Sequence, residues 1–463
     1  MTLGKHMLFK ALGNWLPDAP CLLTREKVYS RSDVDRLAAD WADTFSQAGA
    51  RAGRWIALRV APTPEAIVDL LALWRCGAEV VLLDANHPPE WAQALTAIAG
   101  VSEILTAGHL PETVSWTDVA GMEDGPAVAV FTSGTESKPK AVVHTLDTLC
   151  VTARAGAGRL GIGDQSVLPM TLPLFHVSGL MTLMRAILAG AACRLPSPEE
   201  GWRDILRSGG YSHVSLVAAQ LSQGMGDPDI KRALQQAKRL LLGGGPVSDT
   251  LLDQAWRDGI PVINSYGMTE TAAMAAMTDP EVNPAGAYAN PLYAGSFSVN
   301  GTGRILIRGP MLFAGWLESG KIRRLNLEPD GWYRTGDIGE MNDAGGIRVQ
   351  GRADSVIISG GEKIHPEWLA AALMDLPGVF AACVAGVPDA TYGEVPAAIL
   401  AMREGEPLPE PETVKRHLQG RFPDWMRPHY VFAWPEEVCA PGPKPPIHRL
   451  KTWAMEYLAR KEG

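Results

Sequence analysis

The residues with the most evident chemistry lie in one short stretch, residues 131–144, which reads FTSGTESKPKAVVH. Hydroxyl side chains, a glycine and lysines follow an apolar run, residues 127–131, that predicts a buried strand. Backbone N–H groups and hydroxyls in such a turn can surround anionic oxygens, and lysine adds a positive charge. The stretch therefore predicts a phosphate-binding loop, although it lacks the spacing of the Walker loop. Taken alone, it leaves open the alternative of a polar turn after a strand.

Length and composition limit the class of protein. With 463 residues the chain exceeds one ordinary hydrophobic core, which predicts two or more domains. The net charge of −9, without a basic run, argues against nucleic-acid binding. The six cysteines form no CxxC pair, so neither a zinc site nor a disulfide framework is indicated. No apolar run is long enough to span a membrane, and we expect a cytoplasmic protein.

Apolar runs alternate with helical patterns along the first 300 residues. They predict, in order, a strand at 55–60, a helix at 64–74 and strands at 78–83, 214–218, 240–242 and 262–263. This rhythm is typical of parallel sheets that carry helices on both faces.

The pattern changes after about residue 300. The later elements are a strand at 303–308, a turn-rich segment at 332–337, helices at 366–374 and 412–419, and a strand at 380–387. We therefore expect an α/β chain with a large N-terminal domain of layered parallel sheets and helices, residues 1–351. A small, mobile α+β C-terminal domain would follow at residues 352–463.

Six further segments accompany the phosphate loop. They are 173–179 (PLFHVSG), 240–246 (LLLGGGP), 264–271 (NSYGMTET), 333–339 (YRTGDIG), 351–366 (GRADSVIISGGEKIHP) and the proline-rich 440–449 (APGPKPPIHR). In this order the seven segments resemble the adenylate-forming enzymes, which include acyl- and aryl-CoA synthetases, luciferases and peptide-synthetase adenylation domains. The resemblance covers most of the chain.

The resemblance implies a two-step reaction that uses ATP, Mg²⁺ and coenzyme A. A carboxylate attacks the α-phosphate of ATP and gives an acyl-adenylate and pyrophosphate, and a thiol then attacks the mixed anhydride. Because two anions must meet, charge neutralisation and positioning would account for most of the catalysis.

The resemblance also assigns the nucleotide site. The residues that would hold the β and γ phosphates are Thr132, Ser133, Gly134, Thr135 and Lys140. Glu270 and Thr135 would bind Mg²⁺, which prefers oxygen ligands. Tyr266 would pack on adenine, Asp337 would accept hydrogen bonds from the ribose hydroxyls, and Arg352 would add a second contact there. The remaining nucleotide-binding candidates are Gly243, Gly244, Gly245, Gly267, Met268 and Thr269. A helix-capping role for Glu270 and a turn role for Asp337 are the structural alternatives.

Lys444 is the expected catalytic lysine, which would reach the reacting carboxylate and the α-phosphate. The Gly-Lys pair usual in the family is missing, prolines flank Lys444, and Lys451 is the alternative. Asp354 matches the pivot about which the family rotates its small domain. Gly360 and Gly361 would let the pantetheine arm pass close to the backbone.

The resemblance is most specific to the o-succinylbenzoate–CoA ligases of menaquinone synthesis. It implies that Arg185 lies near the succinyl carboxylate, because a dicarboxylic acid needs a second counter-charge. His176 would lie at the mouth of the acid pocket and take part in catalysis, and Gln220 and Ala273 would line the pocket. A solvent-facing arginine and a packed histidine are the structural alternatives for Arg185 and His176.

Departures from this family leave other acids and roles open. Residues 217–220 read VAAQ where the family has Val-Pro-Thr-Gln, Ala273 replaces a serine, and Glu136 and Ser137 alter the phosphate loop. An apolar pocket would suit a benzoate- or anthranilate-type acid, or a medium-chain acid. The further alternatives are a stand-alone enzyme that loads a carrier protein and a nucleotide-binding paralogue without catalysis. A homodimer is compatible with the family, but no residue pattern indicates an interface.

Overall fold

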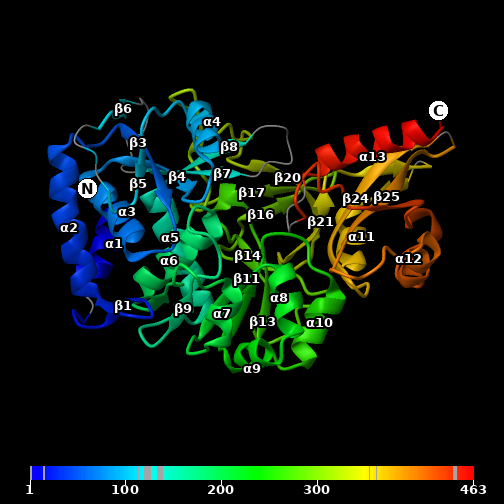
Figure 1. Cartoon of the computed structure of the whole chain (residues 1–463), viewed down its shortest axis with the longest axis horizontal. Coiled ribbons are helices and arrows are strands. Elements are labelled where there is room, and N and C mark those ends of the chain that lie inside the picture. Colours follow the sequence, from blue (N-terminus) through cyan, green and yellow to red (C-terminus); the bar gives the residue numbers. More distant parts are fainter. Residues whose placement is uncertain are drawn as a thin grey trace.

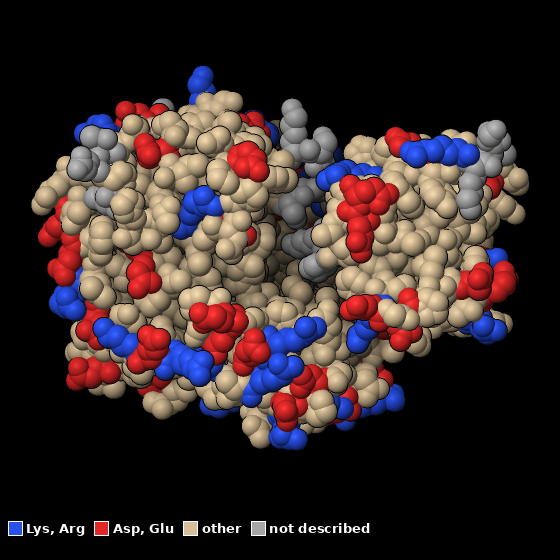
Figure 2. Space-filling model, viewed as in Figure 1, with Lys and Arg blue, Asp and Glu red and all other residues tan. Residues whose placement is uncertain are grey.

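The computed structural model describes residues 3–13, 16–109, 111, 114–118, 127–132, 139–353, 355–360, 362–389, 391–441 and 446–462. A large unit, drawn from blue to yellow, lies beside a smaller unit that contains the C-terminus (Figure 1). The space-filling view shows a hollow between the two units (Figure 2). Six site candidates lie outside the described residues: the phosphate-binding Ser133, Gly134 and Thr135, the hinge residue Asp354, the coenzyme A contact Gly361 and the catalytic candidate Lys444.

An eight-stranded sheet contains the phosphate-loop strand. Its parallel members are β3 (Arg54–Val60), β4 (Glu79–Asp84), β5 (Ile104–Thr106) and β7 (Ala127–Thr132). Its antiparallel members are β6 (Thr117–Asp118), β8 (Lys140–Thr145), β18 (Gly315–Glu318) and β19 (Lys321–Arg324). The predicted strands at 55–60 and 78–83 and the helix between them are thus confirmed.

A second sheet carries the Gly-rich and Tyr-Gly-Met-Thr-Glu motifs. Its parallel strands are β11 (His213–Leu216), β12 (Arg239–Leu242) and β13 (Val262–Tyr266), and the antiparallel β14 (Ala276–Met277) and β15 (Asn290–Pro291) extend it. The strand predicted at 214–218 ends earlier, at Leu216, because Val217 is the N-cap of α8 (Ala218–Met225).

Two four-stranded sheets complete the large unit. One consists of β1 (Pro20–Leu23), β2 (Val28–Ser30), β9 (Val167–Pro169) and β10 (Ala192–Arg194). The other is antiparallel and consists of β16 (Phe297–Val299), β17 (Arg304–Ile307), β20 (Tyr333–Met341) and β21 (Ile347–Arg352). The prediction of a turn at 332–337 was therefore wrong. Thr335 is buried, and its hydroxyl donates a 2.8 Å hydrogen bond to the carbonyl of Ile305, which keeps the segment in the sheet.

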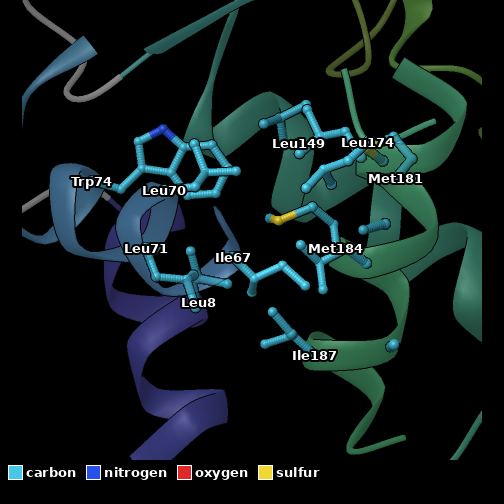
Figure 3. Packing of buried hydrophobic residues seen from close by; sticks show 14 of the residues in the cluster. Leu8, Ile67, Leu70, Leu71, Trp74, Leu149, Leu174, Met181, Met184 and Ile187 are labelled. Carbon is cyan, nitrogen blue, oxygen red and sulfur yellow. The ribbon is translucent and has the colours of Figure 1, made fainter. Parts of the chain in front are cut away.

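Helices of the large unit pack the sheets together. They are α1 (Leu3–Gly13), α2 (Arg31–Gln47), α3 (Pro64–Cys76), α4 (Pro89–Ala99), α5 (Leu146–Leu160), α6 (Val177–Ala189), α7 (Trp202–Arg207), α8, α9 (Pro228–Gln236) and α10 (Asp249–Arg257). Figure 3 shows Leu8 of α1, Ile67 and Leu71 of α3, and Met184 and Ile187 of α6 meeting in one core. Residues 66–74 of α3 are all buried, Asp69 included, so this helix is covered on every side, as its mostly apolar sequence requires.

The smaller unit is a five-stranded sheet with three helices. Its strands are β22 (Ile357–Ser359), β23 (Glu362–Ile364), β24 (Val379–Asp389), β25 (Gly393–Met402) and β26 (Tyr430–Ala433), and its helices are α11 (Pro366–Leu373), α12 (Pro411–Leu418) and α13 (Ile447–Glu462). The predicted helices and the strand of this part are confirmed. No helix among the described residues has the length and apolarity needed to cross a membrane.

Candidate active site

The carboxyl ends of β11, β12 and β13 meet at one edge of their sheet because the three strands are parallel. Gly243 follows β12, and a Cβ on it would lie 2.6 Å from Oγ of Ser265. Gly244 has a φ of 87° and lies close to Val217, so a side chain there would be strained. Gly245 is exposed in the same turn. The glycine run thus leaves an open backbone beside the end of β13.

Tyr266, Asp337 and Arg352 come together from three strands. The Tyr266 hydroxyl donates a 2.7 Å hydrogen bond to Oδ2 of Asp337, and Nη1 of Arg352 lies 3.7 Å from Oδ1. A Cβ on Gly336 would lie 2.5 Å from Cζ of Arg352, so this glycine makes room for the guanidinium. Three residues predicted to bind adenine and ribose therefore form one cluster.

Glu270 lies on the 3₁₀ turn Thr269–Thr271, next to this cluster. Burial raises the pKa of the Glu270 carboxyl, and the charge of Asp337 adds to the rise, whereas Arg352 and Lys140 oppose it. Among the described residues no lysine or arginine forms an ion pair with Glu270, although these two cations are near enough to affect its pKa. The carboxylate is thus available to a cation.

The backbone around Glu270 is tightly constrained. A Cβ on Gly267 would lie 1.7 Å from the carbonyl oxygen of Ala273, so only glycine fits there. Ala272 and Ala273 have φ values of 50° and 76°, in the left-handed region that costs an alanine about 1 kcal/mol or more. The N–H of Met268 donates a 3.0 Å hydrogen bond to Oγ1 of the buried Thr271. Such local strain is typical of functional sites.

His144 is a residue of this site that the sequence did not reveal. Its ring is fully buried, and its Nε2 lies 2.6 Å from the carbonyl oxygen of Thr269, the residue before Glu270. Burial lowers the pKa of His144 to about 4, so the ring is neutral near pH 7 and Nε2–H donates to the carbonyl. A histidine inside an otherwise apolar strand, residues 141–144, was the one sequence signal.

The two ends of the phosphate loop lie opposite each other. Thr132 ends β7 and Lys140 begins β8, and the two residues pair across the antiparallel strands. The Thr132 hydroxyl lies 3.5 Å from the carbonyl oxygen of Lys140. The described residues on either side of the loop therefore belong to an antiparallel pair of strands, which confirms the predicted strand before the loop.

Arg185 is buried rather than solvent-facing. It lies on α6 with 3% of its surface exposed, and Nη2 donates a 3.2 Å hydrogen bond to Oγ1 of Thr182. Burial alone lowers the pKa of its guanidinium to about 10. A Cβ on Gly156 would lie 2.9 Å from Cε of Met274 and 3.5 Å from Cδ of Arg185. The side chains of Arg185 and of Met274, the residue after Ala273, therefore both lie next to Gly156.

The other acid-pocket candidates have different positions. The side-chain oxygen of Gln220 accepts a hydrogen bond from the Val217 N–H at 3.0 Å, and Nε2 donates to the Thr171 carbonyl at 3.2 Å. Its amide therefore holds the turn that faces Gly244. His176 is exposed at the start of α6, with its ring against Phe175, in keeping with a pocket mouth.

In the smaller unit, Gly360 and Lys451 can be placed. Gly360 has a φ of 57° and donates its N–H to the carbonyl of Tyr392 at 2.8 Å. Nζ of Lys451 lies 2.6 Å from Oε1 of Glu394. Lys451 is thus held to β25, which argues against it as the catalytic lysine in this conformation.

The described residues suit a cation that arrives with a nucleotide. No group of three or more His, Cys, Asp or Glu side chains among them could hold a metal by itself. Mg²⁺ in nucleotide sites is usually held by one or two carboxylates together with substrate phosphates. Glu270, a carboxylate close enough to Lys140 for that charge to act on its pKa, fits this arrangement.

Comparisons with known proteins agree with this geometry. Residues 115–317 match the family model described as AMP-binding enzyme, and residues 369–438 match its C-terminal domain. The chain is 30% identical to the 2-succinylbenzoate–CoA ligase of Geobacillus kaustophilus, over 90% of this chain and 93% of that protein. It resembles the Bacillus subtilis o-succinylbenzoate CoA synthetase in complex with the acyl-adenylate intermediate OSB-AMP, with a TM-score of 0.79, 24% identity, and coverage of 92% and 94% of the two chains. The complex of that enzyme with ATP and magnesium ion gives a TM-score of 0.78 at 24% identity, over 92% and 95%.

Proposed function

The chain belongs to the AMP-binding enzyme family, and on that premise we propose that it is an ATP-dependent 2-succinylbenzoate–CoA ligase. It would form an acyl-adenylate with release of pyrophosphate, and then a thioester of coenzyme A with release of AMP. The gathering of Tyr266, Glu270, Asp337 and Arg352 at one place supports the nucleotide half of this proposal. The choice of 2-succinylbenzoate as the acid is supported by the similarity to 2-succinylbenzoate–CoA ligases.

The observation that favours a dicarboxylic acid is the burial of Arg185. A buried guanidinium without an anionic partner costs several kcal/mol, and no described carboxylate forms an ion pair with Arg185. A second carboxylate on the substrate would supply the missing partner through charge-assisted hydrogen bonds. An acid with a single carboxylate would leave this charge uncompensated.

The test compares wild-type protein with Arg185→Met on 2-succinylbenzoate and on benzoate, with pyrophosphate release as the readout. We expect Arg185→Met to lower kcat/KM for 2-succinylbenzoate at least about 30-fold, since it removes a charge-assisted contact. Its melting temperature should not fall, because an uncompensated buried charge is removed. Arg159→Met, at an exposed arginine of α5, is the matched control.

Other outcomes select the alternatives. Faster turnover of benzoate, anthranilate or octanoate by the wild type would favour the apolar pocket that Ala273 and residues 217–220 suggest. Acyl-adenylate formation without transfer to coenzyme A would favour a carrier protein as the acceptor. Binding of ATP without activation of any acid would favour a non-catalytic paralogue.

We further propose a boundary between domains 1–351 and 352–463, a hinge at Asp354 and catalysis by Lys444. The hydrophobic clusters support the boundary, since those of the smaller unit contain residues only from Ile357 onward. The side chain of Ser248 in the large unit donates a 2.9 Å hydrogen bond to Asp375 of the smaller unit.

A cytoplasmic location is also proposed, where ATP and coenzyme A are available and the six cysteines stay reduced, as they are here.

A further inference from the structure

Two successive carbonyl groups fix the backbone on both sides of the Glu270 side chain. The carbonyl oxygen of Thr269 accepts the 2.6 Å hydrogen bond from His144, and that of Glu270 accepts a 2.9 Å hydrogen bond from the N–H of Phe313. Because both peptide planes are held, the direction in which the Glu270 side chain leaves the backbone is fixed.

Both hydrogen bonds lead back to β8. His144 is a residue of β8, and Phe313 precedes Ala314, whose N–H donates a 2.8 Å hydrogen bond to the carbonyl of Val143. Strand β18 continues this pairing, with Gly315 opposite Val143. Two connections, one through His144 and one through Phe313, therefore fix the position of Glu270 relative to β8.

Strand β8 also pairs with β7, the strand that precedes the predicted phosphate loop. Strand β8 begins at Lys140, which pairs with Thr132 at the other end of the loop. Thr132 and Lys140, at the ends of the predicted phosphate loop, are thus linked through β8 and its hydrogen bonds to Glu270, the carboxylate that would bind Mg²⁺. We propose that His144 is a positioning residue, which sets the Glu270 carboxylate relative to Thr132 and Lys140 at the two ends of the predicted phosphate loop and thereby sets the affinity for Mg²⁺–ATP. This inference rests on one part of the proposed function, namely that Glu270 binds Mg²⁺.

The segment has a reason to need such a positioning residue. After Glu270 the chain passes through the left-handed conformations of Ala272 and Ala273, and a strained segment persists only when its surroundings determine it. His144 is fully buried, so water cannot replace its hydrogen bond to Thr269. Loss of the donor would leave the Thr269 carbonyl with only the longer hydrogen bond from the N–H of Ala272, at 3.2 Å, and free the 3₁₀ turn to relax.

The experiment measures ATP binding to the full-length protein by calorimetry as Mg²⁺ is varied, with no acid present. His144→Leu removes the donor and keeps an apolar side chain, whereas the amide of His144→Gln can still donate to Thr269. We expect His144→Leu to raise the Mg²⁺ concentration for half-maximal ATP binding about tenfold, and His144→Gln to stay within about twofold of wild type.

His213→Leu is the matched control, because the ring of His213 is also buried with Nε2 3.1 Å from a carbonyl oxygen, that of Leu160. It should lose stability without a shift in the Mg²⁺ requirement. If His144→Leu does not fold, His144→Asn takes its place, because its shorter amide cannot reach Thr269.

A folded His144→Leu or His144→Asn with the wild-type Mg²⁺ dependence would overturn the inference. So would a His144→Gln as defective as His144→Leu. Because no acid is present, a wild-type protein that binds Mg²⁺–ATP but activates no acid would contradict the proposed function alone. The role of His144 would still be measured.

Discussion

The hydroxyl of Tyr266 donates a 2.7 Å hydrogen bond to Oδ2 of Asp337, 71 residues further along the chain. Burial raises the pKa of Tyr266, and the charge of Asp337 adds to the rise, so the hydroxyl stays protonated near neutral pH. The bond joins the end of β13 to β20 and thus connects the sheet that carries the predicted adenine contacts to the sheet that carries the predicted ribose contact.

Tyr266→Phe should weaken ATP binding, because Asp337 loses a neutral donor that orients its carboxylate. We expect the KM for ATP to rise about fivefold with a smaller change in kcat, measured by pyrophosphate release. Tyr288→Phe is the matched control, since its hydroxyl donates a 2.8 Å hydrogen bond to Oε1 of Glu340. An equal rise in the KM for ATP in both variants would show that the hydrogen bond to Asp337 makes no specific contribution to ATP binding.

Gly267→Ala should disrupt the fold around Glu270. The new Cβ would lie 1.7 Å from the carbonyl oxygen of Ala273, and Ala272 and Ala273 are already strained, so the backbone has little freedom to move. We expect a loss of about 3 kcal/mol or more in stability, seen as a lower melting temperature. Gly158→Ala in α5, where nothing lies within 4 Å, should be neutral or stabilising. Equal melting temperatures for the two variants would contradict the steric argument.

The parallel strands were predictable because their apolar runs are local features. Residues 55–58 and 80–83 are continuous apolar stretches, with a capped helix between them. The strand at 333–341 was not predictable from its sequence, because Thr-Gly-Asp also suits a turn. The segment is a strand because it pairs with β17 and β21, which are distant or follow later in the chain. For the same reason the contact of His144 with Thr269 and the burial of Arg185 could not be predicted, although the place of His144 in an apolar strand is a signal of its burial. Both depend on the assembly of distant segments.

Glu79 should make the stability of the protein depend on pH. It is 1% exposed on β4, accepts a 3.1 Å hydrogen bond from the N–H of Gly53, and burial raises its pKa from 4.5 to about 7. Its stabilising contribution is therefore complete below about pH 4.5 and is lost as the pH rises to about 7.

Glu79→Gln cannot ionise, so its stability relative to wild type should increase from pH 5 to pH 8. The gain should approach about 3 kcal/mol, measured as the difference in melting temperature at each pH. The exposed Glu404→Gln should show no such trend. A constant difference between Glu79→Gln and wild type across this range would refute the assignment.

Lys444 and Lys451 should differ in their effects. Lys444→Ala should lower the rate of acyl-adenylate formation by at least about 100-fold and spare thioester formation from supplied acyl-adenylate, because it would contact the α-phosphate only in the first step. Lys451→Ala breaks a partly exposed ion pair with Glu394 and should change either rate less than about threefold. A larger loss of acyl-adenylate formation in Lys451→Ala than in Lys444→Ala would instead assign the catalytic role to Lys451.

The most direct test of the proposed function is to incubate the wild-type protein with ATP, Mg²⁺, coenzyme A and 2-succinylbenzoate, and to detect the products by mass spectrometry. We predict 2-succinylbenzoyl-CoA and AMP in equal amounts, and no thioester when ATP or the acid is left out. Failure to form this thioester, while benzoate or another monocarboxylic acid is converted, would contradict the account.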